Sequence, residues 1–296
     1  MLRQRDALMR LETPFLTSFP SLEVYIESVP ATPFASKPVR YLRTSPEYEM
    51  KRLLCEGAGK IFQLCRCFRQ DEFGTIHNPE FTMLEWYAPD MPLDGIIAET
   101  DDLLQEIIGC GSGEIINYNE LFIRYTGYTP SDIDFSLFRT LCTAHNLTVP
   151  SSLDASADPD EYLHFLMGLL IEPQIGQERP IFVRDFPLSQ AALAQLNADG
   201  QTAARFEAYY KGVELCNGYQ EINSYEEQYT RFKELAAKRK ALGKTEYLPD
   251  TFFLEALKTG NMPPCSGNAL GVDRLIMLAL NKSSLADITA FTADRC

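Results

Sequence analysis

Residues 61–88 constrain the fold of this chain more than any other stretch. The segments 61–69 and 80–87 are rich in apolar and aromatic residues that roughly alternate with polar ones, a pattern typical of half-buried β-strands. The polar connection between them contains Gly74 and Pro79, two residues that favour a turn. The stretch therefore predicts an antiparallel hairpin whose connection is longer than a tight two-residue turn.

Glu85 is the most informative residue of this predicted hairpin. Because side chains alternate along a strand, Glu85 shares one face with Phe81, Met83 and Tyr87. A carboxylate buried among such residues needs a hydrogen-bonded or cationic partner; a solvated edge strand is the alternative interpretation. The hairpin also combines cations with stacking surfaces, which favours a polar-ligand site over an apolar core: Arg66, Arg69, His77, Phe81 and Trp86.

A second group of acidic residues lies near the start of the chain's last third. Glu207 and Glu214 are seven residues apart, which would place them on opposite faces of one straight strand. A turn at Lys211-Gly212 would instead form a hairpin that brings the two carboxylates together. Such a pair is a possible Mg²⁺ site, and two separate surface glutamates are the alternative. Two further candidate ligand contacts follow, Asn217 and Glu221.

Ser45 begins a predicted helix over residues 46–54. Serine is a favoured N-cap, proline is favoured at the first helical position, and acidic residues suit the positive end of a helix. Ser45, Pro46, Glu47 and Glu49 provide this arrangement. An ordinary capped helix would explain the pattern without any ligand.

Residues 270–280 carry another cation of interest. Gly271 would let the backbone approach a ligand closely. Arg274 lies in the first turn of the apolar helix predicted to follow, and it cannot point into a core without a partner. We therefore expect Arg274 to project toward the hairpin.

Other segments complete the predicted organisation. The patterns predict helices over residues 1–9, 93–108 and 225–242, the last with a solvated face of mixed charges, and a buried strand over 181–187. Most of 114–205 is expected to be helical. Residues 109–113 are Gly-rich but lack the Lys-Ser/Thr ending of a phosphate-binding loop, so we interpret them as a turn. No linker of low complexity divides the chain, which favours one domain.

The composition argues against several functions. The chain has 27 Lys and Arg against 41 Asp and Glu, a net charge of −14. Because nucleic-acid affinity depends on phosphate neutralisation, extended tRNA binding is disfavoured and a basic protein partner fits better. Eight cysteines without a C-x-x-C pair and three histidines predict no zinc site. No apolar run reaches the ~20 residues that span a bilayer, and no leader opens the chain, which predicts a cytoplasmic protein with no membrane partner.

Two of these stretches resemble the signature motifs of one enzyme family. The run FRQDEFGTIHNPEFTMLEWY, residues 68–87, resembles motif 2 of the lysyl branch of class II aminoacyl-tRNA synthetases, and GNALGVDR, residues 267–274, resembles motif 3. The resemblance extends from about Leu11 to the end of the chain and is closest to a truncated branch that ligates (R)-β-lysine to elongation factor P. It implies an α+β fold, with an antiparallel sheet flanked by helices in one catalytic domain over residues 1–296. It also implies a mainly helical insertion at about 95–175, no anticodon-binding domain, and a homodimer formed through the segment that ends near Pro14.

The resemblance implies ATP-dependent activation of a substrate carboxylate as an acyl-adenylate. Because the carboxylate is already ionised at neutral pH, the protein has to align two anions and neutralise charge at phosphorus. Fixed arginines suit that task, so Arg69 and Arg274 are the predicted catalytic residues, with Arg274 and Phe81 on opposite faces of adenine. By the match to the family, Glu207 and Glu214 would hold Mg²⁺. The residues implied to contact ATP are Arg69, Asp71, His77, Asn78, Phe81, Glu207, Ala208, Glu214, Gly271 and Arg274. The family usually has glutamate where this chain has Asp71, so Asp71 and Glu72 are alternatives for that acidic role.

Charge also decides the predicted amino-acid pocket. Its acidic groups would offer several acceptors with no nearby cation, so it would bind a diamine acid and reject aspartate or asparagine. Lysine or (R)-β-lysine is the predicted substrate. Ala269 stands where lysyl-tRNA synthetases carry glycine, and the resemblance implies that this methyl group accompanies a preference for (R)-β-lysine. The implied substrate contacts are Ser45, Pro46, Glu47, Glu85, Tyr87, Glu214, Asn217, Glu221 and Ala269.

The resemblance and the acidic charge together imply a protein acceptor, a lysine side chain of elongation factor P. Few residues precede Pro14, so we expect no anticodon-binding barrel. Two other functions stay open: a lysine-activating core that acts on tRNA or a small molecule, and a non-catalytic paralogue that only binds a partner. An acidic substrate would require a cation in place of Glu85 or Glu221. A non-catalytic paralogue would be expected to lose Arg69, Arg274 or the Glu207/Glu214 pair, and all of these are present.

Overall fold

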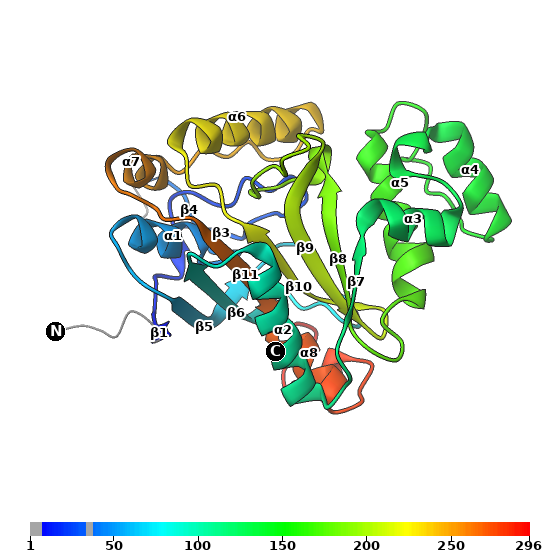
Figure 1. Ribbon diagram of the computed structural model, residues 1–296, viewed down its shortest axis with the longest axis horizontal. Coiled ribbons are helices and arrows are strands. Elements are labelled where there is room, and N and C mark those ends of the chain that lie inside the picture. The colour runs from blue at the N-terminus through cyan, green and yellow to red at the C-terminus, as the bar shows by residue number, and fades with distance from the viewer. Residues whose placement is uncertain (1–7, 34–37) are drawn as a thin grey trace. The chain divides into compact units, whose positions relative to one another are not determined.

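The computed structural model describes residues 8–33 and 38–296 (Figure 1). The predicted N-terminal helix lies almost entirely outside these residues, and Met9, its last predicted residue, begins the short strand β1 (Met9–Arg10). No helix within the described ranges is both long and apolar enough to cross a membrane. The chain divides into two compact units, which are described one at a time. Unit 1 comprises Met1–Ile96, Ala192–Ala194 and Gly218–Cys296, and unit 2 comprises Ile97–Ala191 and Gln195–Asn217.

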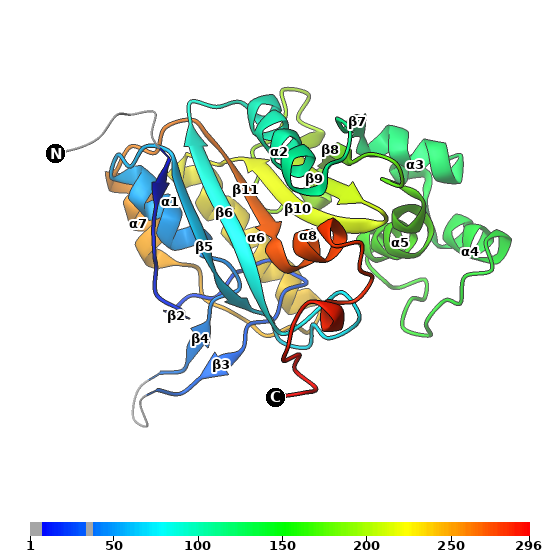
Figure 2. The same cartoon turned by 90° about the horizontal axis from the view of Figure 1, so that it is seen from below.

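The main strands of unit 1 are built on the predicted hairpin. Strands β5 (Ile61–Phe68) and β6 (Glu80–Pro89) pair antiparallel, which confirms a hairpin with a long connection. Strand β11 (Cys265–Gly271) pairs antiparallel with β6, and β1 pairs parallel with β5. Figure 2 shows these four strands side by side in the order β1, β5, β6, β11.

Strand β6 has two chemically different faces. Glu85 lies opposite Gln63 of β5 and Ala269 of β11, and it shares a face with the other odd-numbered residues of β6, as the alternation predicts. Trp86, the single tryptophan of the chain, points to the other face. It is buried there, opposite Phe62 and Asn268.

Four helices of unit 1 are α1 (Glu47–Cys55), α6 (Tyr225–Ala241), α7 (Thr251–Thr259) and α8 (Val272–Ala279). An aromatic cluster joins the first three: Tyr48 of α1 packs against Phe232 of α6 and Phe253 of α7, with ring centroids 5.5 and 5.7 Å apart. A small antiparallel sheet has the order β2-β4-β3. Its strands are β2 (Leu16–Thr17), β3 (Pro30–Ala31) and β4 (Arg40–Leu42).

Two local predictions in unit 1 are wrong. Helix α1 starts at Glu47 with Pro46 at the N-cap, one residue later than predicted. The Ser45 hydroxyl does accept a hydrogen bond from the Glu47 amide, but it donates its own proton to Glu85, so Ser45 joins α1 to β6. Helix α6 has the predicted extent but not a purely solvated face. Its Arg239 is fully buried, because the backbone of residues 23–26 and the Glu27 carboxylate supply its hydrogen-bond acceptors.

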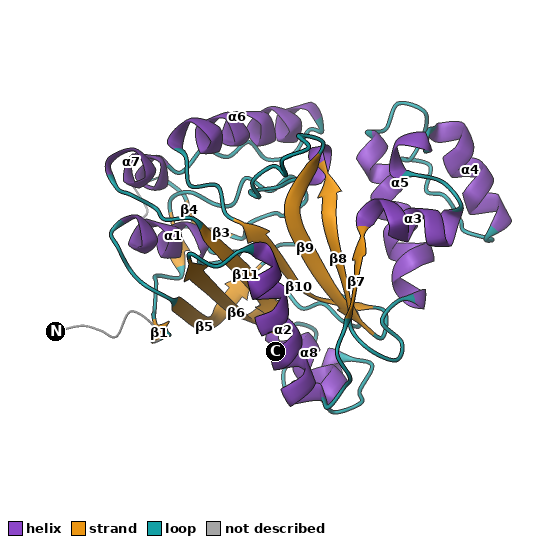
Figure 3. Ribbon diagram, viewed as in Figure 1, coloured by secondary structure: helices purple, strands orange, loops and turns teal. Residues whose placement is uncertain are grey.

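Unit 2 combines strands with a helical region (Figure 3). Strand β7 (Glu114–Asn117) pairs parallel with β8 (Ile181–Pro187), which pairs antiparallel with β9 (Thr202–Tyr210). Strand β8 confirms a prediction, whereas β7 falls in a stretch that the sequence predicted to be helical. Between β7 and β8 lie the helices α3 (Tyr118–Thr126), α4 (Phe135–Ala144) and α5 (Pro159–Leu166), which contribute to one apolar core.

Two elements are divided between the units, α2 (Leu93–Ile108) and β10 (Val213–Gln220). Helix α2 has the predicted bounds, and Ile96, Ile97 and Leu104 are buried along it. Lys211 and Gly212 connect β9 to β10 with φ of 50° and 74°, which confirms the predicted turn.

The complete strand order is β1-β5-β6-β11-β10-β9-β8-β7. The predominance of antiparallel pairs, together with the helices, confirms the α+β class. The short 3₁₀ and π segments are Pro130–Asp132, Met167–Ile171, Glu172–Gln174, Leu188–Gln190 and Leu285–Asp287.

Candidate active site

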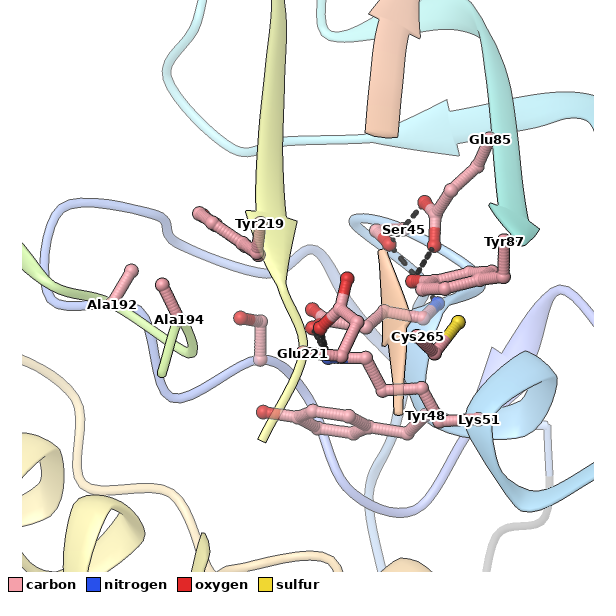
Figure 4. Close-up of polar contacts among 12 residues, drawn as sticks. Ser45, Tyr48, Lys51, Glu85, Tyr87, Ala192, Ala194, Tyr219, Glu221 and Cys265 are labelled. Carbon is pink, nitrogen blue, oxygen red and sulfur yellow. Dashed lines mark hydrogen bonds and ion pairs between the residues drawn. The ribbon is translucent and has the colours of Figure 1, made fainter. Parts of the chain in front are cut away.

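Glu85 lies in a buried cluster of polar side chains from α1 and the residues before it, β6, and the residue that follows β10, beside β11 (Figure 4), and we propose that this cluster forms the wall of an amino-acid pocket. Glu85 is 1% exposed. The Tyr87 hydroxyl donates to its Oε1 at 2.5 Å, and the Ser45 hydroxyl donates to its Oε2 at 2.7 Å. The prediction that this buried carboxylate has hydrogen-bonded partners is confirmed, and both partners are neutral hydroxyls.

The surroundings of Glu85 favour its protonated form. Burial raises the pKa of Glu85 to about 8, and the negative charge of Glu47 acts in the same direction. The hydrogen bonds from Tyr87 and Ser45 oppose this rise in the pKa without cancelling it. A cation placed beside Glu85 would therefore gain an ionised partner by displacing a proton.

The same pocket contains a cation that the sequence interpretation missed. Lys51 is fully buried, and its Nζ lies 2.5 Å from Glu47 Oε1 and 2.5 Å from Glu221 Oε2. The prediction of acidic groups with no nearby cation is therefore wrong. Glu47 and Lys51 are four residues apart on α1, a spacing that places both side chains on one helix face.

The pKa shifts of this ion pair follow from its burial. Burial disfavours the charged form of Lys51, but the carboxylates of Glu221 and Glu47 outweigh it and raise the Lys51 pKa. Burial raises the pKa of Glu221, and Lys51 opposes that rise. Lys51 and the carboxylates of Glu47 and Glu221 thus form a charge cluster in which Lys51 is the ion-pair partner of both carboxylates.

Gly267 and Ala269 form the β11 side of the pocket. Gly267 lies opposite Tyr87, and a Cβ at this position would collide with the Glu221 carboxylate and the Tyr87 ring. Ala269 lies opposite Glu85. Together with Phe81, it packs against a buried sulfur cluster formed by Cys65, Cys67 and Met83. The absence of a side chain at Gly267 thus leaves room for the Glu221 carboxylate and the Tyr87 ring, and the small Ala269 side chain lies opposite Glu85.

Arg69 lies at the start of the connection between β5 and β6. Its guanidinium lies over the Phe81 ring, 5.0 Å from the centroid, and 3.5 Å from a Glu72 carboxylate oxygen. Among the described residues, its buried Nε has no hydrogen-bond partner. Asp71, in contrast, is exposed and adopts a left-handed backbone conformation with φ of 63°. Of the two acidic candidates, Glu72 is the one that contacts Arg69.

Arg274, on α8, contacts the part of the same connection that lies nearer to β6. Its Nε donates to the Ile76 carbonyl at 3.2 Å, and its terminal nitrogen lies 2.5 Å from His77 Nε2. The prediction that Arg274 projects toward the hairpin is confirmed. Because arginine only donates hydrogen bonds, His77 Nε2 is the acceptor, which assigns the proton of a neutral ring to Nδ1. Asp273 fixes the start of α8 by accepting a hydrogen bond from the Thr82 amide at 2.5 Å.

Two other residues predicted to contact ATP also lie close to this connection. Asn78 donates to the Glu80 carbonyl at 2.6 Å and accepts from the Ala293 amide at 3.0 Å. Gly271 lies opposite Met83 in the β6–β11 pair. The structure thus places Arg69, His77, Asn78, Phe81, Gly271 and Arg274 around the β5–β6 connection or the adjoining ends of β6, β11 and α8.

In unit 2, Glu207 is buried beside Arg205, which forms an ion pair with it, and the Tyr209 hydroxyl also donates to it. Arg205 also donates to Asn217 Oδ1 at 3.2 Å. Burial raises the pKa of Glu207, Arg205 opposes the rise and Glu214 adds to it. The effect of Glu214 on that pKa indicates that the two carboxylates interact, as expected for the two strands of one hairpin.

The acidic residues of unit 2 fit a magnesium site only as a pair. Within the described ranges, no group of three or more His, Cys, Asp or Glu residues is arranged to hold a metal ion. Mg²⁺ is commonly held by one or two carboxylates together with substrate phosphates and water. Glu207 and Glu214 provide that minimum, with Ala208 between them in sequence on β9.

Three residues with clear roles in these clusters were not predicted: Lys51, Arg205 and Gly267. Lys51 could have been found, since a lysine on the buried face of a helix needs a carboxylate and Glu47 stands four residues before it. Arg205 could have been found from its position two residues before Glu207, on the same face of a strand. The contact between Gly267 and Glu221 is set by tertiary packing, and no local pattern reveals it.

Comparison with known proteins identifies relatives of this chain. The family described as tRNA synthetases class II (D, K and N) matches residues 4–295. A protein named elongation factor P--(R)-beta-lysine ligase, from Salmonella arizonae, is 48% identical over 256 residues, which are 86% of this chain and 78% of that protein. These similarities confirm the resemblance that the two motifs suggested.

Proposed function

The chain belongs to the class II aminoacyl-tRNA synthetases of the aspartate, lysine and asparagine group, and from this premise we propose that it is a ligase that activates lysine or (R)-β-lysine with ATP. The acyl group of the resulting adenylate is transferred to a lysine side chain of elongation factor P. The name and the 48% identity of the Salmonella arizonae relative support this acceptor. The choice of amino acid rests on one observation: the carboxylate of Glu85 is buried and accepts hydrogen bonds from two hydroxyls.

Glu85 suits a substrate with a positively charged side chain. Its two hydroxyl partners fix the carboxylate, and a substrate ammonium would supply the counter-charge that they lack. An aspartate or asparagine side chain would bring an oxygen toward this carboxylate and leave it without a cation. We place Ser45, Pro46, Glu47, Tyr87, Glu214, Asn217, Glu221 and Ala269 with Glu85 in the amino-acid site.

Arg69 and Arg274 carry the proposed chemistry at the phosphates. The substrate carboxylate attacks the α-phosphorus of ATP, a bond forms from carboxylate oxygen to phosphorus, and pyrophosphate leaves. The free Nε of Arg69 supplies a donor for the α-phosphate, and Arg274 covers the nucleotide from the other end of the β5–β6 connection. We place Asp71, His77, Asn78, Phe81, Ala208 and Gly271 beside the nucleotide. Mg²⁺ bound by Glu207 and Glu214 would neutralise phosphate charge.

The proposed second step transfers the acyl group. The neutral amine of an acceptor lysine attacks the adenylate carbonyl, an amide forms, and AMP leaves with the bonding electrons. The net charge of −14 is compatible with a basic protein surface as the acceptor. Four further statements remain predictions. The protein forms a homodimer, is located in the cytoplasm and makes no extended contact with tRNA. Residues 95–175 are an insertion in one catalytic domain.

ATP–pyrophosphate exchange tests the activation step. We expect exchange with (R)-β-lysine, α-lysine or both, and background exchange with aspartate or with no amino acid. Exchange that requires aspartate, or no exchange with any diamine acid, would contradict the proposal.

A transfer assay with labelled amino acid tests the acceptor. We expect label on elongation factor P, no label on a variant whose acceptor lysine is replaced by arginine, and none on tRNA. Activation followed by labelling of tRNA or a small molecule would instead support a lysine-activating core with another acceptor.

A further inference from the structure

One arginine of unit 2 contacts two residues that have proposed ligand roles. Arg205 Nε donates to Asn217 Oδ1 at 3.2 Å, one terminal nitrogen donates to the Gln190 carbonyl at 2.6 Å, and the other forms the ion pair with Glu207. The guanidinium also lies over the Phe186 ring, 4.4 Å from its centroid. Each of its three nitrogen atoms therefore has a different acceptor. Two of these acceptors are Asn217 and Glu207, which we assign to the amino acid and to Mg²⁺.

The third acceptor of Arg205 is anchored by residues with no proposed ligand role. The Ser189 hydroxyl and the Gln190 side-chain amide both donate to Asp160 Oδ1, at 2.7 and 3.2 Å. Asp160 is buried and lies in the first turn of α5. These hydrogen bonds hold the segment that carries the Gln190 carbonyl, and this carbonyl accepts from Arg205. The guanidinium is therefore held by parts of unit 2 outside the proposed site.

The contact with Arg205 fixes which end of the Asn217 amide faces the guanidinium. Because arginine only donates hydrogen bonds, the amide oxygen faces Arg205 and the amide nitrogen faces away from it. The oxygen and nitrogen ends of an amide have nearly the same shape, so the hydrogen-bond partner decides between the two orientations. Arg205 therefore selects the orientation in which Asn217 meets a ligand.

Arg205 also fixes the Glu207 carboxylate. Arg205 binds its Oε1, and the Tyr209 hydroxyl donates to its Oε2. Each carboxylate oxygen has more than one acceptor position, so these partners do not prevent Glu207 from binding a metal ion. Mg²⁺ demands near-ideal octahedral geometry, and a carboxylate with a fixed orientation suits that demand better than a mobile one.

We propose that Arg205 is a positioning residue of the activation reaction, in which one guanidinium orients the Asn217 amide for the amino acid and the Glu207 carboxylate for the magnesium ion of ATP. This inference rests on the proposed function and deepens it. Arg205 acts on the amino acid through Asn217 and on the nucleotide through Glu207. Its loss therefore weakens the binding of both substrates, each through a different residue.

The first test is Arg205→Met, which removes all three donors and keeps an unbranched side chain. We expect the Kd for (R)-β-lysine, or for α-lysine if it is the better substrate, to rise about tenfold, the effect of one lost hydrogen bond. Calorimetry without ATP or metal measures this Kd. The KM for ATP in pyrophosphate exchange should rise by a similar factor, because Glu207 loses its fixed orientation. Arg179→Met is the matched control, since Arg179 is also in unit 2, is 57% exposed and pairs with Glu114 at 3.5 Å. The control should leave both constants unchanged.

A double-mutant cycle with Asn217→Ala distinguishes positioning from a general structural role. If Arg205 acts on the amino acid through Asn217, Arg205→Met should change the Kd by less than about twofold once the Asn217 side chain is absent. Its effect on the KM for ATP should persist in that background. An unchanged Kd or an unchanged KM for ATP in folded Arg205→Met would overturn the inference. An equal rise in the Kd with and without the Asn217 side chain would also overturn it.

Circular dichroism and urea unfolding establish whether each variant is folded. If Arg205→Met does not fold, Arg205→Lys replaces it in the same cycle, because lysine keeps the charge but lacks the planar fork of three nitrogen atoms. A raised Kd that Asn217→Ala abolishes as a separate effect then supports the inference, and an additive or absent effect overturns it.

The design separates this inference from the proposed function. If the wild-type protein binds a diamine acid and exchanges pyrophosphate but the cycle is additive, only the role of Arg205 is overturned. If the wild-type protein neither binds a diamine acid nor exchanges with one, the proposed function fails, and the positioning role of Arg205 fails with it.

Discussion

Arg239 and Arg69 are cations of the same unit with opposite surroundings. Arg239 is fully buried and donates to the carbonyls of Glu23, Ile26 and Thr245 and to the Glu27 carboxylate, at 2.6 to 2.9 Å. Arg69 is 25% exposed, contacts Glu72 at 3.5 Å, and keeps a buried Nε with no hydrogen-bond partner among the described residues.

The difference is the one expected between a structural arginine and an arginine with the proposed ligand-binding role. The donors of Arg239 are used by the protein, which holds residues 23–27 against α6. Arg69 lies over the Phe81 ring, and one of its donors, the buried Nε, has no hydrogen-bond partner among the described residues. Burial without hydrogen bonding is unfavourable for such a group, which is compatible with the proposed role of Arg69 in binding a phosphate.

Substitution of Arg69 is the strongest test of this contrast. We expect Arg69→Ala to lower the rate of ATP–pyrophosphate exchange by about 10³-fold, because a fixed cation at the transferred phosphate is lost. The midpoint of urea unfolding should change little, since the side chain makes few protein contacts. Exchange at nearly the wild-type rate would contradict the assigned role, and so would loss of exchange caused only by unfolding.

Substitution of Arg239 should produce the opposite result. We expect Arg239→Met to lower the free energy of unfolding by about 3 kcal/mol, because Glu27 and several carbonyls lose a buried partner. Exchange per folded molecule should fall far less than in Arg69→Ala. Urea unfolding measures the first effect, with Lys240→Met as an exposed control on the same helix. Unchanged stability would show that the hydrogen bonds of Arg239 do not stabilise the fold.

The contrast extends to acidic residues, since Glu27 pairs with Arg239 whereas Glu85 is bound by hydroxyls. With a pKa of about 8, Glu85 carries a proton at pH 6 to 7 and must release it when an ammonium binds. The apparent affinity for the diamine acid should therefore rise up to tenfold per pH unit between pH 6 and about 8, then level off. Calorimetry in buffers of different ionisation enthalpy would measure the released proton. Glu85→Gln should bind more weakly and without this pH dependence. A flat profile in the wild-type protein would contradict the proposed contact.

The smallest expected effect concerns the apolar wall of the same pocket. Ala269→Gly removes a methyl group opposite Glu85, which should move the preference between (R)-β-lysine and α-lysine toward α-lysine by about tenfold or less. The ratio of kcat/KM for the two amino acids measures the change. If the ratio stays the same, the methyl group does not determine the isomer.

The sequence predicted those features that depend on neighbouring residues. Alternation located β5, β6 and the face of Glu85, helical spacing gave the bounds of α2, and Lys211-Gly212 gave the turn between β9 and β10. The contacts of Arg274 with the hairpin were predicted because an arginine on an apolar helix needs partners.

The remaining features depend on residues that are far apart in the sequence. Glu221 lies 2.5 Å from Lys51 although much of the chain separates them, so no spacing rule predicts the pair. Helix α6 has an exposed charge pattern, but residues 23–27 bury its Arg239. In both cases, the partner that permits a buried charge comes from another element, and only the fold reveals it.

The position of Trp86 has a practical consequence for studying this protein. It is the single tryptophan of the chain, and it is buried on the face of β6 opposite Glu85 and Tyr87, its neighbours along the strand, so it is a natural fluorophore behind the strand that carries both residues. The indole emission of the unlabelled chain therefore reports on one strand, and a shift in its wavelength during titration has a single structural origin.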